Sequence, residues 1–69
     1  MGEKLTTWQE KAARFILSRN DAGLGAIMPY AELISAANEL TAAGLAEDRG
    51  GTERRWLTPE GRAALEAKP

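Results

Sequence analysis

The sequence predicts a single, mostly helical α+β domain in which two helices, a β-hairpin and a third helix follow one another. Apolar residues recur at helical spacing in two stretches, and a glycine pair separates two short strand-like segments. Near the end, a Thr-Pro-Glu sequence is typical of a helix start. A length of 69 residues suits one domain, so residues 1–69 are expected to fold as a unit.

The first helix is expected over residues 8–20. Thr7 and Glu10 have the spacing of a capping box, in which a hydroxyl accepts from a helix amide and a carboxylate accepts from the cap amide. Gly23 or Asn20 is expected to take the positive φ that ends this helix. Its buried stripe is expected to consist of large apolar residues at helical spacing, Trp8, Phe15 and Ile16.

Residues 23–28 are expected to form a connector, because two glycines within three residues disfavour a helix. From this connector, Leu24 and Ile27 are expected to reach the core. Ile27 is also a candidate for a short edge pairing with the hairpin that follows.

The second helix is expected over residues 29–43, because Pro29 suits a first helical position that needs no amide hydrogen. Gly44 is predicted to be the left-handed residue just beyond it. Leu45 would then pack against Leu40, as in a Schellman motif. The buried stripe is expected to comprise Leu33, Ile34, Ala37 and Leu40.

A hairpin is expected over residues 45–58 and a third helix over residues 59–67. Thr58 is the predicted N-cap of this helix and Pro59 its first residue. Gly61 is expected to weaken the helix.

Composition gives enzyme chemistry little support. The chain has no cysteine and no histidine, so it offers neither a thiolate or imidazole metal ligand nor a Ser-His or Cys-His pair. The Gly-x-Gly of residues 23–25 is too short for a phosphate loop. We therefore expect a non-enzymatic protein without cofactor or metal. No stretch approaches the length of a membrane span and residues 1–7 lack an apolar signal region, so a cytoplasmic protein without a membrane partner is expected.

Two segments carry a family resemblance. Residues 40–47 read LTAAGLAE, and residues 55–65 read RWLTPEGRAAL. Together they resemble the end of the recognition helix, the wing and the following helix of bacterial winged-helix regulators of the MarR and PadR kinds. The resemblance implies a minimal winged-helix-like domain, order α-α-β-β-α, that binds double-stranded DNA as a transcriptional regulator. The N-terminal half departs from this pattern, because residues 20–28 leave no room for the supporting helix of a helix-turn-helix.

Carried onto this chain, the resemblance makes residues 30–43 the helix that enters the major groove. Asn38 would then read adenine, and Ser35 or Thr41 would contact a phosphate. The same helix carries two glutamates and no lysine or arginine, which disfavours a phosphate-facing surface.

The predicted wing carries arginines on both sides of the glycine pair, Arg49, Arg54 and Arg55. In the DNA-binding interpretation, these side chains contact phosphates or the minor groove. The alternative is that they pair across the strands with their acidic neighbours, Glu47, Asp48 and Glu53.

Trp8 and Trp56 are expected to be core aromatics that fix the first helix and the hairpin. The alternative is that one of them is exposed and anchors a partner. Tyr30, beside Pro29, is expected to be partly exposed and to serve a partner.

Two functional hypotheses follow. The first is a small DNA-binding protein that uses residues 30–43 and the arginine-bearing hairpin. The alternative is a protein-binding module on the same scaffold, such as a phage or mobile-element protein that inhibits or adapts a larger host complex. The apolar residues are 43% of the chain and many are alanine, so the core should be thin and a homodimer would help it.

Overall fold

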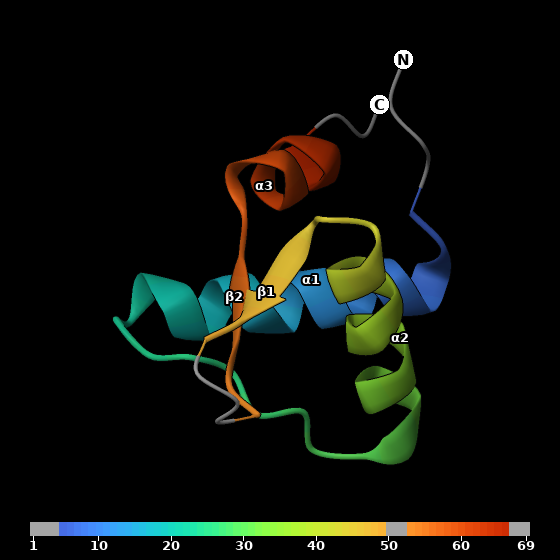
Figure 1. Ribbon diagram of the computed structural model, residues 1–69, viewed down its shortest axis with the longest axis horizontal. Coiled ribbons are helices and arrows are strands. Elements are labelled where there is room, and N and C mark those ends of the chain that lie inside the picture. Colours follow the sequence, from blue (N-terminus) through green and yellow to red (C-terminus); the bar gives the residue numbers. More distant parts are fainter. Residues whose placement is uncertain (1–4, 50–52, 67–69) are drawn as a thin grey trace.

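Three helices and one antiparallel hairpin make up residues 5–49 and 53–66, the part of the chain that the computed structural model describes. The elements are α1 (Thr7–Asp21), α2 (Ala31–Ala42), β1 (Ala46–Asp48), β2 (Arg55–Leu57) and α3 (Pro59–Glu66). Their order confirms the predicted fold class. In Figure 1, α1 runs behind the hairpin and contacts α2, β2 and α3, so it is the element around which the others pack.

The capping box of α1 lies one residue earlier than predicted. Thr6 is the N-cap: its hydroxyl accepts from the Gln9 amide at 3.1 Å, and the Gln9 side chain accepts from the Thr6 amide at 3.0 Å. The prediction for Thr7 and Glu10 is therefore wrong. Glu10 lies one position beyond the box and pairs with Arg14 instead, at 2.9 Å. Glutamine accepts as well as glutamate in this role.

Asn20 joins the end of α1 to β2. Its side-chain oxygen accepts from the Leu57 amide at 2.9 Å, and its side-chain nitrogen donates to the carbonyls of Leu24 and Arg55. The left-handed residue that ends α1 is Gly23, with φ of 85°. The structure thus selects Gly23 from the two predicted candidates.

The connector buries different residues from those predicted. Leu24 and Ile27 are each 50% exposed, whereas Ala26 and Met28 are buried. Ala26 exchanges two backbone hydrogen bonds with Arg55, at 2.8 and 2.9 Å, so the expected edge pairing occurs one residue before Ile27. Successive residues of an extended segment point to opposite sides. Once Ala26 and Met28 face the core, Ile27 must face away.

Helix α2 begins at Ala31, so the prediction that Pro29 is its first residue is wrong. Tyr30 is the N-cap and has an extended backbone, with φ and ψ of −156° and 171°. The helix thus starts only after the connector, which pairs with the hairpin at Ala26, has ended. The expectation for Ile34 is also wrong, since its side chain is 44% exposed. The buried stripe of α2 comprises Leu33, Ala36, Ala37 and Leu40.

The end of α2 is the predicted Schellman motif. Gly44 has φ of 79°, the Leu45 amide donates to the Leu40 carbonyl at 2.9 Å, and the Gly44 amide donates to the Thr41 carbonyl at 3.1 Å. Leu45 packs against the core, as the motif requires.

The hairpin pairs Ala46 with Leu57 and Asp48 with Arg55. Thr58 then caps α3 as predicted, accepting from the Gly61 amide at 3.0 Å. The glycine pair of residues 50–51 and the predicted last helical residue, 67, lie outside the described residues.

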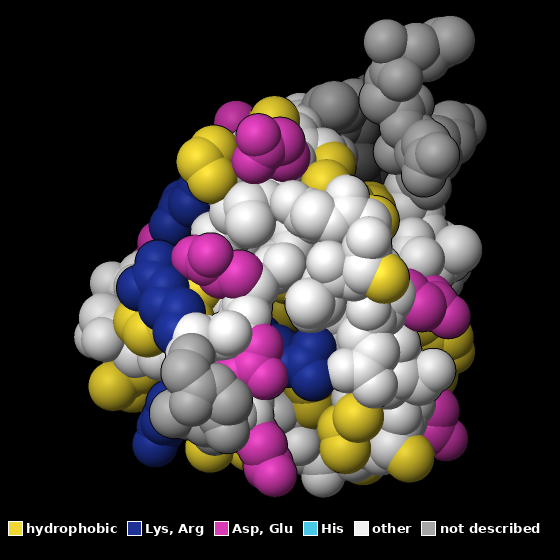
Figure 2. Space-filling model, viewed as in Figure 1, with side chains coloured by type: hydrophobic (Ala, Val, Ile, Leu, Met, Phe, Trp, Pro, Cys, Tyr) yellow, Lys and Arg dark blue, Asp and Glu magenta, His cyan; other side chains and the backbone are white. Residues whose placement is uncertain are grey.

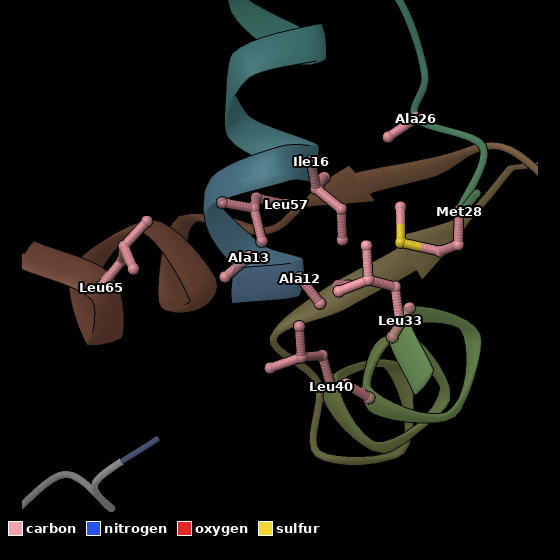
Figure 3. Close-up of a cluster of buried hydrophobic side chains, with 12 residues drawn as sticks. Ala12, Ala13, Ile16, Ala26, Met28, Leu33, Leu40, Leu57 and Leu65 are labelled. Atoms are coloured by element: carbon pink, nitrogen blue, oxygen red, sulfur yellow. The ribbon is translucent and has the colours of Figure 1, made fainter. Parts of the chain in front are cut away.

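The core fills the space between α1, α2, the hairpin and α3, and half of it is alanine. In Figure 3, the side chains of Ile16, Met28, Leu33 and Leu40 point toward one another, while Leu65 joins from α3. Trp8 is 41% exposed, and the buried residues of α1 are Ala12, Ala13 and Ile16. The expectation that Trp8 is buried is therefore wrong. Ala12 and Ala13 let α1 approach its neighbours closely, and the indole ring of Trp8 lies at the edge of the core.

Candidate functional site

Three of the predicted site residues meet in one hydrogen-bond network. Arg55 on β2 donates from Nη1 to the Thr41 hydroxyl at 2.9 Å and from Nη2 to the Asn38 side-chain oxygen at 2.6 Å. Its Nε is buried and has no hydrogen-bond partner within the described part of the chain. The guanidinium thus lies between the hairpin and α2 and joins them.

This network occupies the polar groups that were expected to contact DNA. The Thr41 hydroxyl donates to the Ala37 carbonyl at 2.9 Å and accepts from Arg55, so both its roles are filled internally. The Asn38 oxygen is likewise taken by Arg55. In this conformation, a DNA contact through the Asn38 oxygen or the Thr41 hydroxyl would compete with Arg55.

The other two arginines of the hairpin lie on its outer side. Arg49 forms an ion pair with Glu47 at 3.0 Å and places its guanidinium carbon 4.4 Å from the centroid of the Trp56 ring. Arg54 is exposed and donates to the Gly25 carbonyl at 3.3 Å. Arg49 and Glu47 belong to the same arm of the hairpin, so this pair is not the cross-strand pairing that the sequence left open.

Tyr30 and Ser35 lie on the side of α2 that faces the start of α1. Tyr30 is 48% exposed and meets Trp8 edge to face, with ring centroids 6.3 Å apart and planes at 85°. Ser35 is exposed and lines a groove with Trp8. The expectation of an exposed Tyr30 is confirmed, and the alternative that one tryptophan is exposed holds for Trp8.

Large apolar side chains form a continuous surface here, which we name the apolar face of α2. It consists of Ile34 on α2 and three residues beside this helix: its N-cap Tyr30, Trp8 on α1 and Ile27 in the connector. Trp8 contacts Tyr30, Tyr30 and Ile34 are one helical turn apart, and Ile34 and Ile27 line the same groove. Each is 41–50% exposed.

The sequence analysis missed this face because it assigned Ile34 and Ile27 to the core. Leu33, Ala37 and Leu40 were predicted correctly as buried. At about 100° per residue, Ile34 and Ala36 lie on opposite sides of that stripe. The structure buries Ala36 and leaves Ile34 exposed, a choice that the helical spacing alone does not make.

A groove runs along each side of α2. The first has a volume of about 340 Å³ and lies between α2 and the start of α1, lined by Thr6, Trp8, Glu32, Ser35, Ala36 and Glu39. The second, of about 260 Å³, lies toward the connector and hairpin, lined by Ile27, Met28, Ile34, Asn38, Glu53 and Arg55. The apolar face of α2 extends from one groove to the other.

Charge is distributed unevenly over the surface. Figure 2 shows Lys and Arg gathered along the edge formed by the end of α1 and the hairpin, with acidic side chains among them. Over α2, on the opposite edge of that view, the visible charges are acidic and lie among hydrophobic side chains. Helix α2 carries Glu32 and Glu39 and no basic residue.

No group of three or more His, Cys, Asp or Glu residues within the described ranges could hold a metal ion. In the same ranges, no helix is both long enough and apolar enough to cross a membrane.

Comparison of the chain with protein-family models, with curated proteins and with solved structures gives no match. Functional inference therefore depends on the chemistry of the surfaces described above.

Proposed function

We propose that this chain is a non-enzymatic binding module that docks onto another protein through the apolar face of α2. The observation that carries this proposal is the continuous exposure of Trp8, Tyr30, Ile34 and Ile27 on a domain with a small core. Contiguous apolar surface bordered by polar residues is typical of protein interaction sites. Exposed aromatic side chains are also frequent binding anchors.

The charge of α2 supports the same choice. In the winged-helix resemblance, which we retain as part of this proposal, α2 corresponds to the recognition helix and the hairpin to the wing. A helix in the major groove lies between two phosphate backbones. Glu32 and Glu39 would be repelled there, and no basic side chain on α2 offsets them. A protein surface imposes no such electrostatic penalty.

A cytoplasmic location fits this proposal.

Site-specific crosslinking tests the proposal. A photo-crosslinking phenylalanine analogue placed at Ile27 should form a discrete covalent adduct with a partner in cells that naturally produce the protein. Adding Ile34→Asp should abolish the adduct, because a buried carboxylate at the centre of the interface has no partner. Ala63→Asp, on the exposed side of α3, is the matched control and should leave the adduct intact. An adduct that survives Ile34→Asp contradicts the proposal.

Binding to the DNA backbone is a second candidate function, favoured by the hairpin arginines. The Arg49 side chain is 60% exposed and Arg54 is exposed, so both cations reach solvent. Such a surface would contact phosphates without inserting α2 into a groove. Glu47 offsets part of the charge of Arg49.

Fluorescence anisotropy of a labelled random duplex across a salt series tests this candidate. Phosphate contacts make affinity fall as salt rises, and replacing both Arg49 and Arg54 by alanine should reduce the logarithmic salt slope by about 2. Absence of binding at low salt removes the DNA candidate and leaves the protein-binding proposal intact.

A further inference from the structure

The groove between α2 and the start of α1 combines an aromatic ring with two carboxylates. Its α2 wall is one helical stripe at three- and four-residue spacing, Glu32, Ser35, Ala36 and Glu39. Thr6 and Trp8 form the opposite wall. The carboxylates therefore border the indole ring that belongs to the apolar face of α2.

Within the described residues, neither of these two carboxylates belongs to an ion pair. The ion pairs within residues 5–49 and 53–66 join Arg14 to Glu10, Arg49 to Glu47, and Arg62 to Asp21. Glu32 and Glu39 belong to none of them. Glu39 accepts a hydrogen bond from the Gln9 side chain at 2.9 Å, but that donor is neutral.

The stability of α2 explains Glu32 but not Glu39. A carboxylate in the first turn of a helix interacts favourably with the helix dipole, and Glu32 has that position. Glu39 begins the last turn, where the dipole is negative and a carboxylate is disfavoured. The hydrogen bond from Gln9 gives Glu39 a neutral donor and leaves its negative charge without a cationic partner among the described residues.

Lys11 places its Nζ 4.7 Å from the centroid of the Trp8 ring, so an ammonium group of this chain already occupies one face of the indole. The groove itself is lined by Trp8, Glu32 and Glu39. A partner's lysine or arginine entering the groove would meet the two carboxylates beside the edge of the apolar face of α2.

We infer that the partner of the apolar face of α2 is a basic amphipathic helix of another protein, with an apolar stripe flanked by lysine or arginine. This inference rests on the function proposed above and adds the chemistry of the partner. The apolar stripe packs on Ile34, Tyr30 and Ile27, in the manner of a helix bound in a groove. The flanking cations pair with Glu32 and Glu39, so charge complementarity selects the partner.

Three matched peptides test the inference. Each is an amphipathic helix of about 18 residues with a leucine stripe, long enough to be helical, and the flanking positions hold lysine, glutamine or glutamate. Anisotropy of the fluorescein-labelled peptides measures their binding to the full chain. The lysine peptide should bind about fivefold more tightly than the glutamine peptide, because two exposed ion pairs are gained. The glutamate peptide should bind most weakly. Salt at about 1 M should remove the preference.

Matched variants locate the preference on the protein. E32Q combined with E39Q should make the lysine and glutamine peptides bind alike, and glutamine at 39 can still accept from Gln9. E60Q combined with E66Q removes the same charge from exposed positions on α3 and should leave the preference unchanged. A preference that persists in the E32Q/E39Q variant overturns the inference.

The remaining outcomes separate this inference from the proposed function. If the lysine and glutamine peptides bind the natural chain equally and Ile34→Asp abolishes both interactions, the protein-binding proposal stands and the basic partner is wrong. If no peptide binds, the inference is overturned and crosslinking at Ile27 alone decides the proposed function. A dimer in sedimentation velocity that Ile34→Asp dissociates would show that a second copy covers this face, which also overturns the inference.

Discussion

Arg55 holds the hairpin against both α2 and the connector. Its backbone exchanges two hydrogen bonds with Ala26, and its guanidinium donates to Asn38 and Thr41. It is half-buried, whereas its neighbour Arg54 is exposed. Arg54 precedes β2 and Arg55 begins it, and the two neighbouring arginines have different roles because successive side chains of an extended chain face opposite sides.

We predict that Arg55→Ala lowers the free energy of unfolding by about 1–3 kcal/mol, because the acceptors on Asn38 and Thr41 lose their partner. Arg54→Ala should change it by less than about 0.5 kcal/mol, as expected for an exposed side chain. Urea unfolding followed by tryptophan fluorescence measures both. If Arg55→Ala lowered the free energy of unfolding no more than about 0.5 kcal/mol, like an exposed residue, its guanidinium would have no structural role.

Gly61 is required by close packing and not by backbone conformation. A Cβ at this position of α3 would overlap the carbonyl oxygen of Leu45. The prediction that Gly61 weakens its helix is therefore incomplete. Because Gly61 has no side chain, α3 can approach the start of the hairpin at Leu45.

Gly61→Ala should destabilise the protein by about 1–3 kcal/mol, although alanine is the better helix former, because the overlap forces α3 away from Leu45. Ala63→Gly, on the exposed side of α3, should cost about 1 kcal/mol through helix propensity alone. Thermal denaturation by circular dichroism compares them. Stabilisation by Gly61→Ala would contradict the close approach.

At the scale of elements, Thr58 connects two helix ends. Its hydroxyl accepts from the Gly61 amide in the first turn of α3 and donates to the Gly44 carbonyl just beyond α2. One side chain therefore caps α3 and fixes its start beside the end of α2.

Thr58→Ala should lower the free energy of unfolding by about 1 kcal/mol, the usual cost of losing an N-cap. Thr58→Ser keeps the hydroxyl and should recover most of that loss. Chemical denaturation measures the two variants. A serine variant as unstable as the alanine variant would indicate that the methyl group matters more than the cap.

At the scale of the whole molecule, the small core leaves little margin. A single core in a chain of this size rarely supplies more than about 3–5 kcal/mol. Leu40 is one of the largest fully buried side chains, and Ile34 on the same helix is 44% exposed.

Leu40→Ala should cost about 2–5 kcal/mol and leave much of the protein unfolded at physiological temperature. Ile34→Ala should cost only about 1 kcal/mol, since the Ile34 side chain is 44% exposed and its removal leaves no cavity in the core. Circular dichroism against temperature distinguishes them. Similar melting temperatures would contradict the assignment of Ile34 to the surface.

The distribution of charge is also a property of the whole molecule. The net charge of −1 suggests a nearly neutral surface, yet basic side chains gather near the hairpin, whereas α2 carries Glu32 and Glu39 and no basic residue. The two candidate functions use different residues of the surface. Variants of the apolar face of α2 therefore test protein binding, and variants of Arg49 and Arg54 test DNA binding.

The sequence by itself determined the order of the elements, the Schellman end at Gly44 and the cap at Thr58. These features are local: their hydrogen bonds join residues a few positions apart, so residue type and spacing suffice. Only the tertiary structure decided that Ile34 faces solvent and that Arg55 turns inward to Asn38. Which side of a helix or strand is buried depends on the elements packed against it, and those contacts join residues distant in the sequence.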